Sequence, residues 1–275
     1  METLAWRGRS VAWERLGEGS TGRRDVVLCH GTPWSSALWR PIAERLAATR
    51  TVYLWDMPGY GRSSKDPAHP VDLGVQGELL ADLLVEWGLE RPHVVAHDFG
   101  GAVSLRAMLL HGASYASLAL VDVVALRPWG SPFFRLVHDH VEVFEQLPPA
   151  IHRGAVEAYV RGASHSGLSV EQLATLVRPW VGDEGQRALY AQMAQADERF
   201  TDEVEPLYDQ IAVPVQVVWG REDTWLPLDH AHRLHQMIPG AQLRLVDGAG
   251  HLIQYDATAE LSDVLSEWLD SVDDR

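Results

Sequence analysis

The 275-residue chain contains a single cysteine, Cys29, so it cannot form a disulfide bond within itself. That scarcity suits a reducing compartment. No apolar run approaches the roughly 20 residues that a membrane-spanning helix requires. The first residues show no apolar stretch behind a basic end, so no signal peptide is visible. We therefore expect a soluble cytoplasmic protein with no membrane partner.

Basic residues are also few, with 23 Lys and Arg against 38 Asp and Glu, which gives a formal net charge of −15. No block of basic residues overrules this balance, and it argues against a nucleic-acid partner because little would neutralise the phosphates. The chain is 46% apolar, which is enough for a sizeable core, and it holds 11 tryptophans. Because pockets for small molecules are mostly apolar and aromatic, some of these tryptophans are candidates for lining one.

Short apolar runs rich in β-branched residues alternate with segments of helical period over most of the chain. This alternation predicts βαβ units, hence a mostly parallel sheet flanked by helices. The expected strands are Val26–His30, Val52–Asp56, His93–Ala96, Leu118–Val124, Val215–Trp219 and Leu243–Val246. The expected helices are Leu38–Ala48, Val75–Trp87, Gly100–Leu110, Leu228–Met237 and Ala257–Leu269. The acidic tail Asp270–Arg275 is expected to fray.

The alternation breaks between residues 127 and 205, where helix-like pieces follow a breaker-rich entry and no strand pattern occurs. The pieces are Phe133–Gln146, Ile151–Gly162, Val170–Val177 and Gln186–Ala196. We predict that residues 127–205 form a helical cap over a site, inserted into a core of residues 1–126 and 206–275. The alternative is a second packed layer with no role in binding.

The segment from Val94 to Gly101 has the pattern of a buried strand, a sharp turn and the start of a helix, with Asp98 at the turn. Small neighbours let such a turn close without a clash. It thrusts the Asp98 side chain out at the carboxyl ends of the strands, where open α/β sheets bind ligands. The alternative is an ordinary N-capping aspartate. The glycines at positions 100 and 101 favour the functional interpretation.

Nearly the whole sequence resembles the α/β-hydrolase family in its element order and in the position of the expected cap. His30-Gly31-Thr32-Pro33 resembles the family's oxyanion loop, and the segment from Asp56 to Ser63 resembles its D-x-x-G-x-G-x-S turn. The serine motif G-x-S-x-G occurs nowhere in the chain. The resemblance is therefore to the branch that uses an aspartate nucleophile, which includes epoxide hydrolases and haloalkane dehalogenases.

The other members of a catalytic triad follow in the family's order, nucleophile, acid and histidine. The resemblance assigns Asp98 as nucleophile, Asp223 as acid and His251 as base, each at or just past the end of an expected strand. Glu222 and, more weakly, Asp122 compete with Asp223 for the role of the acid. The resemblance also implies that the backbone N–H groups of Thr32 and Phe99 form the oxyanion hole.

An aspartate nucleophile points to substitution at a saturated carbon. A serine attacking such a carbon would form an ether, which has no carbonyl for water to attack, whereas a carboxylate forms an ester that water can reopen. His251 would then take a proton from the water, and Asp223 would orient the imidazole and stabilise its charged form.

The leaving group is less well specified. Thr32 and Phe99 replace the Asn and Trp that commonly bind halide in haloalkane dehalogenases, so we expect opening of a small apolar epoxide by water. The alternatives are dehalogenation, ester or lactone hydrolysis, and a ligand-binding scaffold without turnover. Candidate pocket residues are His30, Trp34, Trp129, Tyr159, Tyr190 and Leu252. We expect no metal and no cofactor, and the sequence leaves a homodimer open.

Overall fold

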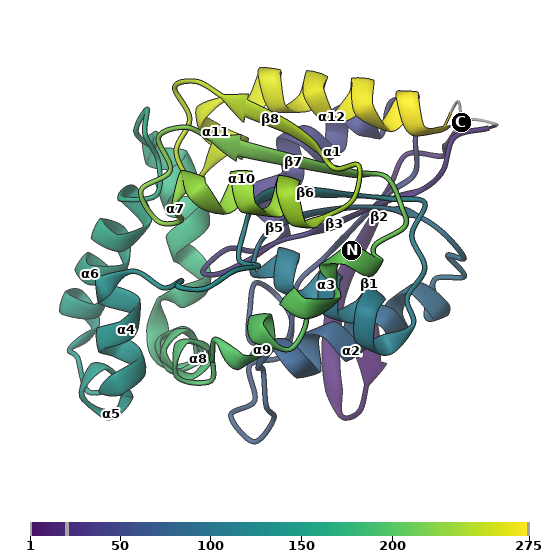
Figure 1. The fold of residues 1–275 in the computed structure, drawn as a ribbon. Coiled ribbons are helices and arrows are strands. Elements are labelled where there is room, and N and C mark those ends of the chain that lie inside the picture. The colour runs from purple at the N-terminus through teal and green to yellow at the C-terminus, as the bar shows by residue number, and fades with distance from the viewer. Residues whose placement is uncertain (1, 20–21, 274–275) are drawn as a thin grey trace.

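The computed structural model describes residues 2–19 and 22–273. Its eight strands form one sheet in the order β1-β2-β4-β3-β5-β6-β7-β8 (Figure 1). From β4 to β8 along this order neighbouring strands are parallel, whereas β2 runs antiparallel to both β1 and β4. The strands are β1 Glu2–Trp6, β2 Arg9–Leu16, β3 Val26–Cys29, β4 Val52–Trp55, β5 His93–Asp98, β6 Ser117–Val123, β7 Val215–Gly220 and β8 Gln242–Val246. The expected mostly parallel sheet is confirmed.

The β1–β2 hairpin at the edge of the sheet was not expected from the sequence, which indicated no strand before Val26. Its burial is uneven: β1 is exposed except near Trp6, and β2 buries Val11 and Ala12 but exposes residues farther along. An edge strand lacks the continuous apolar run that marks a strand covered on both faces. The apolar pattern therefore gave too weak a signal.

Helices cover both faces of the sheet. One face carries α1 (Arg40–Leu46) and α12 (Thr258–Asp273), and the other carries α2 (Leu73–Glu86), α3 (Phe99–His111) and α10 (Leu228–Met237). The pleat sends successive side chains of one strand to opposite faces: in β5, Val94 and Ala96 join the core under α2 and α3, and Val95 joins the other. Among the described residues, no helix is both long and apolar enough to cross a membrane.

Between β6 and β7 the chain forms a group of short helices, which gather at the left of Figure 1. They are α4 Pro132–Asp139, α5 Val141–Phe144, α6 Pro149–Arg161, α7 Val170–Val177, α8 Gly182–Ala194 and α9 Arg199–Asp202. Residues 127–205, all of them described, contain no strand, as the sequence indicated. The expected single piece over residues 133–146 is broken at His140, whose backbone (φ −139°) leaves the helical region. We call residues 127–205 the cap segment.

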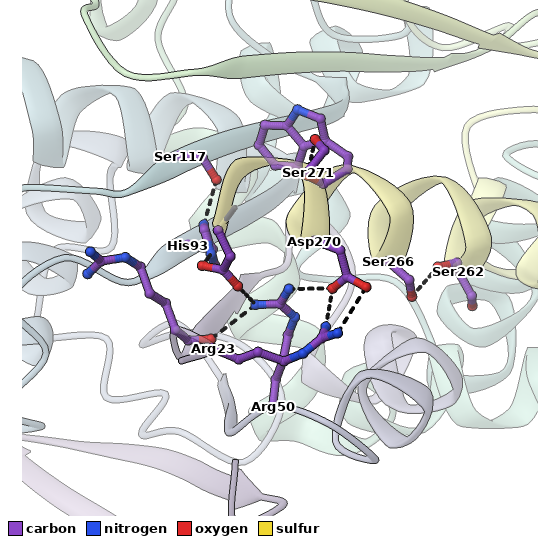
Figure 2. Close-up of polar contacts among 11 residues, drawn as sticks. Arg23, Arg50, His93, Ser117, Ser262, Ser266, Asp270 and Ser271 are labelled. Atoms are coloured by element: carbon purple, nitrogen blue, oxygen red, sulfur yellow. Dashed lines mark hydrogen bonds and ion pairs between the residues drawn. The ribbon is translucent and has the colours of Figure 1, made fainter. Parts of the chain in front are cut away.

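A buried ionic cluster anchors the end of α12 to the sheet (Figure 2). The Arg50 side chain is only 1% exposed, and its guanidinium binds Asp270 at 2.6 Å and also Asp273. The His93 ring lies between Asp273 (2.9 Å) and Ser117 (2.7 Å). The prediction of a frayed tail is therefore wrong for residues 270–273, because a buried cation holds them; residues 274 and 275 lie outside the described part of the chain.

We expect Arg50→Met to lower the free energy of unfolding by about 3 kcal/mol, the lower end for breaking a buried ion pair, because Asp270 retains solvent contact. The matched control is Arg244→Met, which removes an exposed partner of Glu260 on the same helix; such pairs contribute less than about 1 kcal/mol. Urea unfolding of both variants measures the difference. Equal losses would show that α12 does not depend on the buried cluster.

Candidate active site

The sheet presents Asp98 at a sharp turn between β5 and α3. Its backbone, with φ 51° and ψ −124°, lies in a region that residues other than glycine rarely adopt,. The two positions after Phe99 are packed too closely for any side chain. A Cβ on Gly100 would lie 2.6 Å from the Cys29 carbonyl oxygen, and one on Gly101 would lie 2.4 Å from the Val123 side chain. The small residues around Asp98 thus permit the turn that the sequence predicted.

The two oxygens of the Asp98 carboxylate have different environments. Oδ1 accepts a hydrogen bond of 2.6 Å from the backbone N–H of Thr32. Oδ2 lies 3.3 Å from Nε2 of His251, a contact without the geometry of a directed hydrogen bond. A Cβ on Gly31 would lie 2.2 Å from Asp98 Oδ1 and 2.6 Å from the backbone nitrogen of Phe99. The two predicted oxyanion-hole donors, the N–H groups of Thr32 and Phe99, therefore both lie next to Gly31.

His251 is oriented by Asp223. Its Nδ1 lies 2.8 Å from Asp223 Oδ2, and the other oxygen of Asp223 accepts hydrogen bonds from the backbone N–H groups of Trp225 (2.7 Å) and Leu226 (3.0 Å). This arrangement places a proton on Nδ1 and turns Nε2 toward Asp98. The structure therefore brings together Asp98, Asp223 and His251, three residues that lie far apart in the sequence.

The charge of His251 depends on both carboxylates. Burial alone would lower its pKa, but the nearby negative charges of Asp223 and Asp98 raise the pKa well above the usual value,. The ring also stacks on Trp225 at a centroid distance of 5.1 Å, which favours a cation,. The two carboxylates and the Trp225 ring therefore favour the charged form of the imidazole.

The two competing acids have other partners. Asp122 is fully buried and accepts a hydrogen bond from the Gly220 N–H; burial, and then the charge of Asp223, raises its pKa well above the usual value, which favours a neutral carboxyl group. Glu222 accepts from the backbone N–H of Ala249. The hydrogen bond to the imidazole belongs to Asp223.

A cavity of about 20 Å³ opens in front of Asp98. Its walls are mostly aromatic or aliphatic, and Thr32, Ser131 and Tyr159 add polar groups. The lining residues are Thr32, Asp98, Phe99, Val124, Trp129, Gly130, Ser131, Phe134, Tyr159, Trp225 and Leu226. Asp98 and Tyr159 are the ionisable side chains in this lining.

The model of one protein family, described as "Alpha/beta hydrolase family", matches residues 26–264. The chain belongs to the α/β-hydrolase family. An α/β-hydrolase fold protein from Burkholderia ambifaria is 41% identical, with a TM-score of 0.92 and coverage of 97% of both chains. The fold class inferred from the sequence is confirmed.

More distant members of the α/β-hydrolase family carry names of hydrolytic enzymes. A 2-hydroxy-6-oxononadienedioate/2-hydroxy-6-oxononatrienedioate hydrolase from Cupriavidus pinatubonensis is 26% identical over 90% of this chain and 87% of its own length. A haloalkane dehalogenase from Agrobacterium tumefaciens shares the fold, with 19% identity, a TM-score of 0.82 and coverage of 98% of this chain and 96% of that one. The protein is a hydrolase of this fold.

Of the predicted pocket residues of this α/β-hydrolase, Trp129 and Tyr159 line the cavity. The Trp129 ring packs edge-on against Phe99, while its indole N–H donates to Thr201 Oγ1 at 3.1 Å. The Tyr159 ring stacks on Trp225 at 4.4 Å, and Ser131 lines the cavity with it. Burial raises the pKa of Tyr159, so the hydroxyl keeps its proton.

His30 and Trp34 lie outside the cavity lining, contrary to expectation. The His30 ring is tied to backbone on both sides: Nδ1 is 2.9 Å from the Gly31 carbonyl oxygen, and Nε2 accepts from the Met57 N–H at 3.0 Å. Trp34 stacks on Trp225, behind the wall, at 5.6 Å. Both side chains support the loops that form the site rather than facing its cavity.

Tyr190 and Leu252 also lie outside the lining. The Tyr190 hydroxyl is 2.7 Å from Nδ1 of His152, within the core of the cap segment. Leu252 is fully buried, and its backbone N–H bonds to the Ala163 carbonyl at 3.0 Å. Helical period showed which segments are helices, but not which face of each helix meets the cavity.

Sequence reasoning missed three residues near the site. Trp225 forms part of the wall and stacks on His251; its position two residues after Asp223 was an available signal. Gln192 and Tyr60 had no local signal. The Oε1 atom of Gln192 accepts from Thr32 Oγ1 (3.0 Å) and from the Tyr60 hydroxyl (2.7 Å), a cluster assembled from three distant segments.

We expect Asp98→Asn to lower the pKa of His251, because one of the two carboxylates that stabilise the imidazolium is replaced by a neutral amide,. An NMR titration of the imidazole nitrogens measures this change. Glu222→Gln is the control, because Glu222 bonds only to backbone near this site. An unchanged titration in Asp98→Asn would show that Asp98 does not act on His251 electrostatically.

Proposed function

We propose that this hydrolase opens small apolar epoxides to diols through an ester formed on Asp98. The observation that carries the proposal is the placement of the Asp98 carboxylate. Oδ1 is bound by a backbone N–H, Oδ2 lies 3.3 Å from Nε2 of His251, and Asp98 lines a mostly apolar cavity. A carboxylate held in this way has one oxygen available to attack a substrate carbon, while the other occupies a site prepared for negative charge.

In the first step, Asp98 Oδ2 attacks an epoxide carbon, and the bond from that carbon to the ring oxygen breaks. The ring oxygen leaves as an alkoxide, which needs a proton. Tyr159 lines the cavity and supplies it. Although burial raises the pKa of Tyr159, an alkoxide is still the stronger base. The product of the step is an ester between Asp98 and the substrate.

In the second step, water attacks the carbonyl carbon of the ester. Esterification removes the negative charge of Asp98, so the pKa of His251 falls and the imidazole loses its proton. That proton restores the Tyr159 hydroxyl, which gave its own proton to the alkoxide. Neutral His251 then accepts a proton from the attacking water through Nε2, and the N–H groups of Thr32 and Phe99 stabilise the negative charge on Oδ1. The intermediate collapses when the bond between the carbonyl carbon and Oδ2 breaks. Oδ2 leaves as the second hydroxyl of the diol with the remaining proton of the added water, and Asp98 is regenerated as a carboxylate beside the protonated His251. Each such donor is typically worth about 3–4 kcal/mol.

The choice of an epoxide over a halide rests on the donors at the cavity. Phe99 offers no side-chain donor, and the Trp129 indole N–H is already bonded to Thr201. Tyr159 instead offers a hydroxyl that can release a proton, which an alkoxide needs and a halide does not. Halide release, ester hydrolysis and binding without turnover are the other outcomes that the experiments below distinguish.

We expect His251→Gln to accumulate an ester on Asp98, because the first step survives and the hydrolysis step loses its base. The protein is incubated with a panel of small epoxides and haloalkanes, weighed intact by mass spectrometry and digested to locate the added mass. Asp98→Asn incubated in parallel should gain no mass. If wild-type protein turns over a compound and His251→Gln never carries mass on Asp98, the covalent mechanism is wrong.

We expect Tyr159→Phe to lower kcat for epoxides by roughly 10²-fold or more, within the usual range for general acid catalysis. Turnover of a haloalkane should change far less, since halide needs no proton. The matched control is Tyr190→Phe, a cap tyrosine that bonds to His152 and does not line the cavity. Equal losses in the two variants, or halide release without any diol, would remove the epoxide assignment.

A further inference from the structure

The loop from Gly31 to Trp34, here called the oxyanion loop, carries the Thr32 N–H that binds Asp98. This loop belongs to the core, but side chains of the cap segment hold it from outside. Gln192 of α8 binds the Thr32 hydroxyl, and the Trp180 indole N–H donates to the Pro33 carbonyl oxygen at 2.7 Å. Two adjacent residues of the loop are thus fixed by two separate residues of the cap segment.

The Gln192 contact is buried and precise in its geometry. The residue is 2% exposed, and its Oε1 accepts from both Thr32 Oγ1 and the Tyr60 hydroxyl. Two donors converging on one acceptor fix the amide, and Nε2 then has no hydrogen-bond partner among the described residues. A buried polar group without a partner is destabilising. The Gln192 amide therefore binds the two hydroxyls through its oxygen while its nitrogen is left without a hydrogen bond among the described residues.

Trp180 adds a second attachment. Its ring is fully buried and meets Tyr60 edge-on at 5.7 Å, so the indole, the phenol and the amide of Gln192 form one packed group against the loop. Thr32 cannot shift without breaking the bond to Gln192, and Pro33 cannot shift without breaking the bond to Trp180. The residue whose N–H faces Asp98, and the residue after it, are therefore both bonded to the cap segment.

A second glutamine of the cap segment provides a comparison. Gln195, at the end of α8, also bonds across to the core, accepting from the Val71 N–H at 2.8 Å. Val71 lies far along the chain from the oxyanion loop and outside the cavity lining. Gln195 therefore holds α8 to the core in the same way as Gln192 does, without touching Thr32 or Pro33.

We propose that Gln192 and Trp180 are positioning residues, which aim the Thr32 N–H at Asp98 and so complete the oxyanion hole only when the cap segment is seated. The effect of this positioning on the reaction rests on the proposed function. The first step needs Oδ2 of Asp98, whereas the second develops charge on Oδ1. Loss of positioning therefore slows hydrolysis of the ester more than its formation.

The first test does not require turnover. Hydrogen exchange of the Thr32 amide is followed by NMR in wild type, Gln192→Leu, Trp180→Phe and Gln195→Leu. We expect exchange to be roughly tenfold faster in Gln192→Leu and in Trp180→Phe, the equivalent of about one net hydrogen bond, and to stay within about twofold of wild type in Gln195→Leu. Gln192→Glu keeps an acceptor oxygen for both hydroxyls and should restore slow exchange.

The second test follows the reaction with His251 intact. During steady-state turnover of an epoxide, Gln192→Leu should carry ester on Asp98 in a larger fraction of molecules than wild type or Gln195→Leu. A purely structural loss would instead lower the amount of active protein, and that fraction would stay the same or fall. A fraction that does not rise, or Thr32 exchange equal in Gln192→Leu and Gln195→Leu, overturns the proposal.

The two proposals fail in different ways. If His251→Gln traps no ester while wild-type protein turns a substrate over, the nucleophilic role of Asp98 is wrong, and the exchange of the Thr32 amide still decides whether Gln192 and Trp180 position the loop. If ester is trapped and Thr32 exchange is unaffected by both cap substitutions, the mechanism stands and the positioning role is wrong.

Discussion

The hydrogen bond from the Thr32 N–H to Asp98 Oδ1, 2.6 Å long, connects the strained turn, the oxyanion loop and the imidazole. It holds one oxygen of a buried carboxylate and so fixes the direction of the other toward His251. A backbone φ of 51° at a residue with a Cβ is unfavourable,, and it persists because the surrounding packing leaves no alternative. The glycines at 31, 100 and 101 are required because each lies against the backbone or side chain of another segment.

The placement of negative charge around His251 depends on this hydrogen bond. Two carboxylates face opposite nitrogens of one ring, Asp223 at Nδ1 and Asp98 at Nε2. Asp223 takes part in three hydrogen bonds, one with the imidazole and two with backbone N–H groups. Asp122 bonds one oxygen to Gly220, while the other has no partner among the described residues, and burial favours its neutral form. Hydrogen bonding thus distinguishes two aspartates close to the same histidine, and only Asp223 bonds to its ring.

Local patterns in the sequence were sufficient for the parts of the structure that local chemistry determines. Asp98 and Asp223 come at or after the fully buried strands β5 and β7, whereas His251 follows the partly buried strand β8. Because all three strands were expected in one parallel sheet, the meeting of these residues at one edge was predictable. The edge strand β2 lacks that signal. Tyr159 and Tyr190 lie on similar helices, and only packing within the cap segment decides that the first faces the cavity and the second faces His152. Gln192 could not be found in this way, because its role exists only where α8 meets the oxyanion loop.

The core and the cap segment contribute different parts of the site. The core supplies Asp98, Asp223 and His251, each at or beyond the end of a strand of one sheet. The cap segment supplies the wall that excludes water, through Trp129 and Tyr159, and it also fixes the loop that carries the Thr32 N–H. The cavity of about 20 Å³ is lined by residues of both the core and the cap segment. The same segment bonds to the oxyanion loop through Gln192 and Trp180, so the wall and the loop are connected through one part of the chain. In the proposed mechanism, the Thr32 N–H is therefore directed at Asp98 Oδ1 by contacts that exist only while the cap segment is seated on the core.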